Sequence, residues 1–251
     1  MSSPWSNLHG LGRGLLSGIT SLIYPNACWM CSELTGEQQG PICAHCLPQL
    51  LNDPFPTCPR CSSTVGPHLV LDDGCLDCMA KTIRFDGAFR MAPYEGALRD
   101  VILRMKNWHG EDLAEVIAPL WARRLAARLL AVKPDIVVPI PLHWMRRWRR
   151  GFNANEILAL HLAKELGIPH LPRLLRRTRR TARQTAQPSA TAREANVKDA
   201  FTASESVDVQ GKTLLLVDDV LTTGATANEA ARALRARKPQ AIYVVVMAHG
   251  K

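Results

Sequence analysis

From Ile83 onward the chain alternates between short apolar runs and segments with helical periodicity. The apolar runs have the length and composition of strands that are buried on both faces. They cover residues 135–140, 214–217 and 241–247. The helical segments cover residues 94–106, 111–132, 155–166 and 227–238. Strands that alternate with helices predict an α/β fold, a parallel sheet flanked by helices on both faces.

Two of these elements contain residues that are expected to break them. Pro119 lies inside the helical segment 111–132 and is expected to interrupt or restart that helix. Residues 83–91 alternate like a strand, and Asp86 and Gly87 are expected to form a turn within it.

The first third of the chain has a different composition, with many prolines and few large aliphatic residues. We expect three parts: an amphipathic segment at 1–24, a cysteine-rich module at 25–82 and the α/β domain at 83–251. The apolar stretch from Leu11 to Tyr24 is broken by glycines and lacks the features of a signal peptide. Since no stretch reaches the roughly 18 apolar residues of a membrane span, we expect a cytoplasmic protein without one.

All eight cysteines lie in the cysteine-rich module and form four Cys-x-x-Cys pairs. The pairs are Cys28 and Cys31, Cys43 and Cys46, Cys58 and Cys61, and Cys75 and Cys78. Two such pairs complete one tetrahedral Zn²⁺ site, so we predict a double zinc ribbon with two structural zinc ions. A proline-rich segment of ~50 residues has too small a core to fold without metal. Disulfides are disfavoured without secretion, and a redox pair would not recur four times.

The sequence leaves the pairing of these cysteines open. A sequential arrangement joins the first pair with the second and the third with the fourth, across gaps of 11 and 13 residues. A crossed arrangement joins the first with the third and the second with the fourth. His45 and His68 are further candidate ligands, but beside a full set of cysteines they are expected on the surface.

Composition narrows the range of ligands. The 251 residues include 31 Lys and Arg against 22 Asp and Glu, a formal net charge of +9. Hydrophobic residues make up 47% of the chain, which is enough for a globular core. The positive charge favours anionic ligands.

The strongest candidate site follows the apolar run from Leu214 to Val217, where the strand is expected to end at Asp218 and Asp219. A turn rich in hydroxyl groups and glycine follows, and Thr226 and Glu229 have the spacing of a capping box for the next helix. Backbone N–H groups at such a turn, together with the helix N-terminus, bind phosphate. Carboxylates accept hydrogen bonds from sugar hydroxyls or bind Mg²⁺. The combination favours a ribose phosphate.

The run Leu216-Val-Asp-Asp-Val-Leu-Thr-Thr-Gly-Ala-Thr226 resembles the phosphoribosyl pyrophosphate (PRPP) motif of type I phosphoribosyltransferases. The resemblance implies that the acidic pair contacts the ribose hydroxyls of PRPP, with Mg²⁺, and that the loop holds the 5′-phosphate. The implied binding residues are Asp218, Asp219, Val220, Leu221, Thr222, Thr223, Gly224, Ala225 and Thr226. The resemblance leaves the acceptor substrate open.

Two arginine-rich stretches lie upstream of this motif. The first, a predicted loop at 141–153, occupies the place of the pyrophosphate loop in this fold. It supplies Arg150 as the expected catalytic contact to the leaving group. The second, at 176–184, is placed like the flexible hood of the fold and adds Arg179 and Arg180 as expected PRPP contacts. Such cations stabilise the charge that develops on departing pyrophosphate.

These arginines also fit two other interpretations. They can be solvated basic faces, or they can bind the phosphates of single-stranded nucleic acid while Trp144 and Trp148 stack on its bases. We favour pyrophosphate for the hood at 176–184 and nucleic acid for the arginines that flank the two tryptophans.

The layout as a whole resembles the ComF (GntX-like) family of competence-associated phosphoribosyltransferase proteins. The segments that carry the resemblance are the cysteine module and residues 94–106, 139–153, 177–184, 193–197 and 216–226. The resemblance implies a role in DNA uptake and natural transformation. It implies single-stranded DNA and a DNA-uptake helicase or other competence proteins as partners. The alternative to a PRPP-using transferase is a non-catalytic binding module of the same machinery.

Overall fold

The computed structural model describes residues 27–36, 40–66, 74–142, 144–179 and 189–250. The chain forms two compact units, Met1–Gln49 and Leu50–Lys251. The predicted amphipathic segment at 1–24 lies outside the described residues. The boundary between the units falls inside the predicted cysteine-rich module, so the second half of that module shares a unit with the α/β domain.

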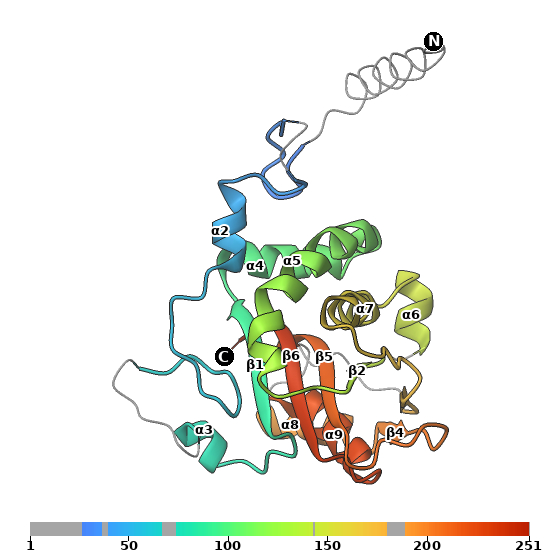
Figure 1. Cartoon of the computed structure of the whole chain (residues 1–251). Coiled ribbons are helices and arrows are strands. Elements are labelled where there is room, and N and C mark those ends of the chain that lie inside the picture. Colours follow the sequence, from blue (N-terminus) through green and yellow to red (C-terminus); the bar gives the residue numbers. More distant parts are fainter. Residues whose placement is uncertain (1–26, 37–39, 67–73, 143, 180–188, 251) are drawn as a thin grey trace, which may run out of the picture. The chain divides into compact units, whose positions relative to one another are not determined.

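A four-stranded parallel sheet forms the centre of the larger unit (Figure 1), as the alternating pattern predicts. Its strand order is β1-β6-β5-β2. The strands are β1 (Gly87–Pro93), β6 (Ala241–His249), β5 (Thr213–Leu221) and β2 (Ile136–Pro139). A second, two-stranded antiparallel sheet pairs β3 (Leu175–Arg177) with β4 (Phe201–Ala203).

Helices cover both faces of the central sheet (Figure 1). The described part of the chain contains the helices α2 (Cys46–Leu51), α3 (Leu76–Met79), α4 (Gly96–Met105), α5 (Gly110–Leu130), α6 (Trp144–Arg150), α7 (Ala154–Leu166), α8 (Ala190–Val197) and α9 (Ala225–Arg235). Helices α5 and α7 pack together on one face, while α9 packs on the other and also contacts β3, β4 and α8. None of the helices in the described part of the chain is both long and apolar enough to cross a membrane.

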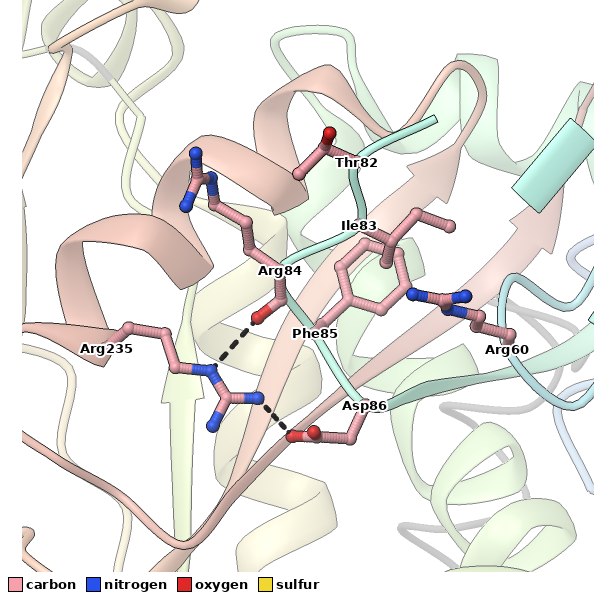
Figure 2. Close-up of a pocket in the computed structure, with 7 residues that line it drawn as sticks. All are labelled: Arg60, Thr82, Ile83, Arg84, Phe85, Asp86 and Arg235. Atoms are coloured by element: carbon pink, nitrogen blue, oxygen red, sulfur yellow. Dashed lines mark hydrogen bonds and ion pairs between the residues drawn. The ribbon is translucent and has the colours of Figure 1, made fainter. Parts of the chain in front are cut away.

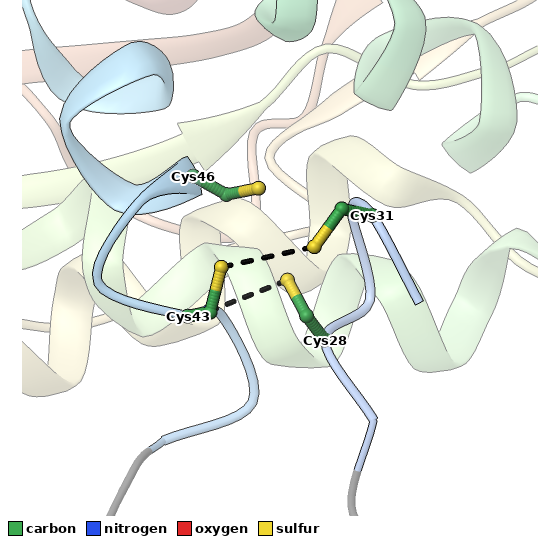
Figure 3. A group of neighbouring side chains, drawn as sticks. All are labelled: Cys28, Cys31, Cys43 and Cys46. Carbon is green, nitrogen blue, oxygen red and sulfur yellow. Dashed lines mark hydrogen bonds between the residues drawn. The ribbon is translucent and has the colours of Figure 1, made fainter. Parts of the chain in front are cut away.

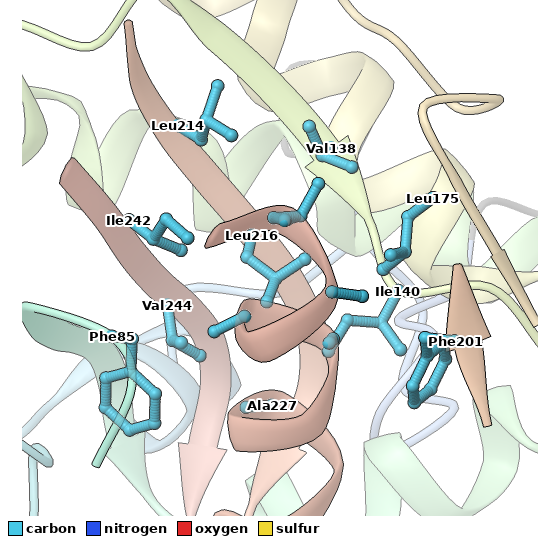
Figure 4. Packing of buried hydrophobic residues seen from close by; sticks show 14 of the residues in the cluster. Phe85, Val138, Ile140, Leu175, Phe201, Leu214, Leu216, Ala227, Ile242 and Val244 are labelled. Atoms are coloured by element: carbon cyan, nitrogen blue, oxygen red, sulfur yellow. The ribbon is translucent and has the colours of Figure 1, made fainter. Parts of the chain in front are cut away.

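The core between the sheet and α9 follows directly from the apolar strands. Leu214 and Leu216 of β5 and Ile242 and Val244 of β6 point to the same side and are fully buried (Figure 4). Alternate strand residues share a face, so each strand contributes side chains to this core at every second position. Ala227 and its neighbouring alanines on α9 are small, which lets the helix lie close to these leucines and valines.

Strand β5 is longer than its apolar run predicts. The strand was expected to end before Asp218, but it pairs with β6 as far as Leu221, which lies opposite His249. The hydrogen bonds come from the neighbouring strand, so polar residues can continue the ladder once β6 is in place. Asp218 and Asp219 therefore stand on a rigid strand and not in a turn.

Helix α5 runs through Pro119 without interruption, so the predicted break is wrong. A proline in a helix removes one N–H hydrogen bond and crowds the preceding turn. Packing offsets this penalty, because Ile117, Trp121 and Leu125 are buried against the rest of the unit. Trp121 also donates a hydrogen bond of 3.1 Å from Nε1 to the carbonyl oxygen of Val246 in β6.

Two other predicted limits are also wrong. The predicted loop at 141–153 contains α6, because residues 144–150 lack glycine and proline; Gly151, with φ of 82°, ends this helix. Strand β1 begins only at Gly87, where a Cβ atom would lie 3.1 Å from the carbonyl oxygen of Pro59. The close approach of this backbone favours glycine; residues 83–86 precede the strand, although Asp86 donates its N–H to the carbonyl of Ile242 over 2.8 Å.

A buried ion pair joins the segment before the second cysteine group to the sheet. Arg90 of β1 is 1% exposed and donates to both carboxylate oxygens of Asp53, over 2.8 and 3.1 Å. It donates a third hydrogen bond, of 2.8 Å, to the hydroxyl of Thr64. Ala88 of the same strand donates to the carbonyl of Pro59 over 3.4 Å. The folding of this segment is therefore coupled to the folding of the sheet.

Replacing Asp53 with alanine is expected to destabilise the larger unit by about 3–5 kcal/mol, because Arg90 would remain buried without its counter-charge. The free energy of unfolding from denaturant titration measures this loss. Asp100→Ala is the matched control, since the Asp100–Arg99 pair is largely exposed, at 70% and 54%, and contributes at most about 1 kcal/mol. Equal effects of the two substitutions would contradict the prediction, and Asp53→Ala with Arg90→Met should recover most of the loss.

Candidate functional site

Asp218 lies near the end of β5 and receives two hydrogen bonds. Nδ2 of Asn155, in the first turn of α7, donates to its Oδ1 over 2.8 Å. The backbone N–H of Asp219 donates to the same oxygen over 3.0 Å. Burial and the adjacent charge of Asp219 raise the pKa of Asp218 to about 7, although both hydrogen bonds favour the carboxylate. Neither Asn155 nor the N–H of Asp219 donates a hydrogen bond to the second carboxylate oxygen, Oδ2.

Asn155 is itself held by the local structure of the segment Gly151-Phe152-Asn153, which precedes it. It is 4% exposed, and its Nδ2 also donates to the carbonyl oxygen of Ile140 over 3.1 Å. Asn153 caps α7, because its side-chain oxygen accepts from the N–H of Asn155 over 3.2 Å. The cap fixes the start of α7 and thereby aims Asn155 at Asp218.

Asp219 faces a different element. Its Oδ2 lies 3.0 Å from Nζ of Lys106, which directly follows α4. The two side chains are 19% and 28% exposed, so the pair is only partly accessible to water. Burial lowers the pKa of Lys106, but the carboxylates of Asp219 and Asp218 and the nearby Tyr94 outweigh it, and the net shift is upward. Lys106 therefore remains a cation beside the acidic pair.

The loop after β5 leads into α9 two residues earlier than predicted. Gly224 is the N-cap of α9 and has φ of 79°, a left-handed conformation that favours glycine. The predicted capping box is wrong, because Glu229 pairs instead with Arg232 and accepts from the N–H of Asp199. A Cβ atom on Gly224 would meet no atom closer than 4.0 Å, so the loop backbone is open on that side.

The other residues of the predicted PRPP motif fall into two groups. Ala225 and Leu221 are buried, and the side chain of Leu221 belongs to the hydrophobic core. Gly250 contacts the start of the loop, because its N–H donates a hydrogen bond of 2.9 Å to the carbonyl of Leu221. The accessible or half-buried members are Val220, Thr222, Thr223, Gly224 and Thr226.

The predicted arginine contacts are placed unevenly. Arg150 is the last residue of α6 and is half-buried. Arg179 is tied to α8, because its Nη2 donates to the carbonyl oxygens of Asn196 and Ala195 over 2.9 and 3.4 Å. Arg177 lies over the ring of Phe201, with 5.1 Å between the guanidinium carbon and the ring centroid. Arg180 and most of the predicted hood lie outside the described residues.

The cysteines form two groups of four in the described part of the chain, with the sequential pairing. Cys28, Cys31, Cys43 and Cys46 form the first cluster, in which all four sulfurs converge (Figure 3). Cys58, Cys61, Cys75 and Cys78 form the second cluster. Sulfur–sulfur distances include 3.8 Å for Cys31–Cys43 and 3.6 Å for Cys61–Cys75. Four sulfurs at about 2.3 Å from one tetrahedral Zn²⁺ would lie roughly 3.8 Å apart. His45 stands apart from the first cluster and bonds to Gln49.

Both clusters begin with the same backbone turn. In the first, Ser32 donates its N–H to the carbonyl of Cys28 and has φ of 64°; in the second, Ser62 does so to Cys58 and has φ of 59°. The N–H of Cys43 also donates to Sγ of Cys28 over 3.3 Å. Burial raises the pKa of Cys28, but such N–H donors outweigh it and bring the value to about 6. A thiolate is the form that binds metal.

The clusters differ in their surroundings. Cys31 of the first cluster is exposed, whereas all four cysteines of the second are buried. Beside the second cluster, Sγ of Cys61 lies 3.1 Å from the hydroxyl of Ser63, which lies 3.3 Å from Nε2 of His249 at the end of β6. Burial lowers the pKa of His249 to about 4, so this imidazole is neutral. The second cluster is therefore joined to the sheet by side-chain contacts.

A depression at the start of β1 is a weaker candidate for a binding site. Its lining residues are Arg60, Thr82, Ile83, Arg84, Phe85, Asp86 and Arg235 (Figure 2). Arg235 bonds to the carboxylate of Asp86 and, over 3.1 Å, to the carbonyl of Arg84. The depression lies at the N-terminal end of β1, whereas Asp218 and Asp219 stand near the C-terminal end of the parallel strand β5. Its cation Arg235 is already paired with Asp86.

Sequence reasoning missed Lys106 and Asn155 as site residues. Lys106 is the last residue of the 94–106 segment noted for its family resemblance, whereas Asn155 lies two positions beyond the end of the 139–153 segment. Each is far from the acidic pair in the sequence, and only the packing of α4 and α7 against β5 brings them there.

Comparison with known proteins identifies the family to which the chain is related. Residues 117–251 match the family described as Phosphoribosyl transferase domain. Competence protein F of Haemophilus influenzae is 32% identical over 200 residues, which cover 77% of this chain and 84% of that protein. DNA utilization protein YhgH of Salmonella typhi is 32% identical over 216 residues, covering 85% and 92%. Competence protein ComFC of Bacillus subtilis is 27% identical over 202 residues, covering 77% of each chain.

Serine replacement of Cys58 and Cys61 is expected to destabilise the larger unit by several kcal/mol, because metal binding at the second cluster would contribute to folding. The same replacement of Cys28 and Cys31 should leave the unfolding of that unit nearly unchanged, since the first cluster lies in the other unit. Calorimetric unfolding and metal content measure both effects. The wild type should carry two equivalents of zinc and each variant about one. Equal shifts in the two unfolding curves would contradict this difference.

Proposed function

We propose that this chain, which belongs to the phosphoribosyl transferase domain family, binds PRPP with Mg²⁺ and acts in DNA uptake. Its relatives include proteins named competence protein F and DNA utilization protein YhgH. The fold is that of a type I phosphoribosyltransferase, a parallel sheet with helices on both faces. Two four-cysteine clusters come before the strands of this fold in the sequence, and we propose that each holds one structural zinc ion. The names of the relatives support the role in DNA uptake.

The observation that carries the PRPP proposal is the arrangement at the end of β5. Asp218 and Asp219 are held by Asn155 and Lys106, and the open backbone at Gly224 leads into the N-terminus of α9. A ligand with a diol next to a phosphate fits both halves of this arrangement. The hydroxyls would donate to the carboxylates, and the phosphate would accept from the N–H groups of the loop and helix.

The donors at this site also suit Mg²⁺. Mg²⁺ prefers oxygen ligands and is usually bound through one or two carboxylates together with substrate phosphates. Asp218 and Asp219 would supply the carboxylates, and the hydroxyls of Thr222 and Thr223 lie in the adjoining loop. When bound, the ion would neutralise the charge of the pyrophosphate group.

In a transfer reaction, the bond between C1′ of the ribose and pyrophosphate breaks while a bond from C1′ to the acceptor forms. The acidic pair would orient the ribose through its hydroxyls, and the loop from Thr222 to Thr226 would fix the 5′-phosphate. Arg150, at the end of α6, is our proposed contact for the leaving pyrophosphate, and Arg180 a further one. Arg179 would support the hood through its hydrogen bonds to α8.

Asp218→Asn with Asp219→Asn is expected to weaken the binding of PRPP with Mg²⁺ at least tenfold, because asparagine keeps the size but loses the charge. Isothermal titration calorimetry measures the affinity, and circular dichroism checks the fold. Asp208→Asn, on the exposed loop before β5, is the matched control and should bind like the wild type. Unchanged affinity in the folded double variant would refute the PRPP assignment.

A second function, the binding of single-stranded DNA, is favoured by α6. Trp148 on this helix is 83% exposed, although indole rings are usually at least partly buried. Four arginines share the helix with it. An exposed aromatic ring on a helix whose sequence contains four arginines fits a surface on which bases stack while phosphates are neutralised.

Trp148→Ala is expected to weaken the binding of single-stranded DNA by about 1–3 kcal/mol, the usual contribution of one stacked base. The slope of affinity against salt concentration should stay the same, since no phosphate contact is lost. Trp108→Ala is the matched control, because Trp108 is 72% exposed but lies in the turn between α4 and α5, with no arginine among residues 105–111. Fluorescence anisotropy with labelled oligonucleotides tests this, and equal losses in both variants would remove α6 as the binding surface.

A further inference from the structure

Lys106 is the cation nearest to the acidic pair in the described part of the chain. Its Nζ lies 3.0 Å from Oδ2 of Asp219, at the place where the proposed function puts ribose hydroxyls and a divalent ion. The pair leaves the other oxygen of Asp219 for a ligand. Lys106 therefore acts on the same carboxylate that the ligand would use.

The backbone around Lys106 is fixed on both sides. Before it, Val101, Ile102 and Met105 anchor α4 in the core. After it, the chain turns at once into α5, and Gly110 is packed so tightly that a Cβ atom would lie 2.3 Å from the carbonyl oxygen of Met105. Only glycine fits this turn, so the start of the Lys106 side chain is held in one place. The ammonium group is therefore held at the site and is not a flexible charge on the surface.

Charge explains what such a cation does here. Asp218 and Asp219 are consecutive residues of one strand, and without Lys106 they would present up to two negative charges, the second when Asp218 ionises above its pKa of about 7, to a ligand that is itself a polyanion. Asn155 also faces the pair, but its side chain is a neutral amide and supplies no compensating charge. Lys106 offsets one negative charge of the pair that the ligand meets, while a metal ion approaching Asp219 meets an ammonium group that repels it.

We propose that Lys106 is a resident counter-ion and positioning residue of the PRPP site, which acts through Asp219 to favour the polyanionic ligand and to oppose a divalent ion in its absence. This inference rests on the proposed function. An ordinary structural ion pair would stabilise the fold and affect both ligands in the same direction. A counter-ion affects them in opposite directions, and this difference can be measured.

Lys106→Gln is expected to bind Mn²⁺, a probe for the divalent site, about tenfold more tightly in the absence of PRPP, because one repelling charge is removed. The same variant should bind PRPP without metal about tenfold more weakly, because the acidic pair is no longer screened. Water-proton relaxation measures the Mn²⁺ affinity and calorimetry the PRPP affinity. Lys106→Arg, which keeps the charge, should resemble the wild type for both ligands.

Lys212→Gln is the matched control. Lys212 lies just before the first residue of β5, at the end of the strand away from the acidic pair. It pairs with Asp135 over 3.4 Å, and the two side chains are 50% and 39% exposed. It should change neither affinity. If Lys106→Gln does not fold, Lys106→Met preserves the packing of the aliphatic stem and replaces it in both measurements.

Weaker binding of both ligands, or unchanged Mn²⁺ affinity in the folded Lys106 variants, would overturn the counter-ion assignment. The Mn²⁺ measurement does not depend on PRPP. A wild-type protein that fails to bind PRPP, with tighter Mn²⁺ binding in Lys106→Gln, would overturn the proposed function and still support the resident counter-ion. Opposite changes in the two affinities would support both.

Discussion

The pairing of β5 with β6 is the interaction on which the rest of the larger unit depends. It extends from Thr213 opposite Ala241 to Leu221 opposite His249, and side chains on both faces are buried. Because β6 continues the ladder beyond the apolar run, two carboxylates stand on a rigid strand in a crowded place. Such carboxylates need partners to remain charged. Helices α4 and α7 supply them through Lys106 and Asn155, so the helix packing also builds the site.

The two cysteine clusters share a backbone turn but have different positions in the fold. The first belongs to the smaller unit and exposes Cys31. The second is buried and joins the sheet through the contact between Ser63 and His249. Gly250, the next residue, bonds to Leu221 at the base of the proposed phosphate loop. A change at the second cluster therefore has a short covalent and hydrogen-bonded route to the loop.

Positive charge in this protein serves structure as well as ligands. The net charge of +9 favours anionic partners. Yet Arg90 is buried against Asp53, Arg232 joins α9 to Asp199, and Arg235 bonds to Asp86 beside β1. Arg179, expected from the sequence to contact PRPP, bonds to carbonyl oxygens of α8. An arginine has five N–H donors, which explains why one side chain can hold two elements together.

The sequence by itself determined the features that depend on neighbouring residues. The spacing of the cysteines predicted two four-cysteine clusters, the apolar runs predicted the parallel sheet, and the order of Asp218, Asp219 and Gly224 predicted an acidic pair followed by a glycine turn into a helix. Each follows from local geometry within a few residues. Only the tertiary structure decided the cysteine pairing, the length of β5, the continuity of α5 through Pro119 and the roles of Lys106 and Asn155. Those depend on contacts between residues far apart in the chain, where the packing energy of whole elements overrides local preference.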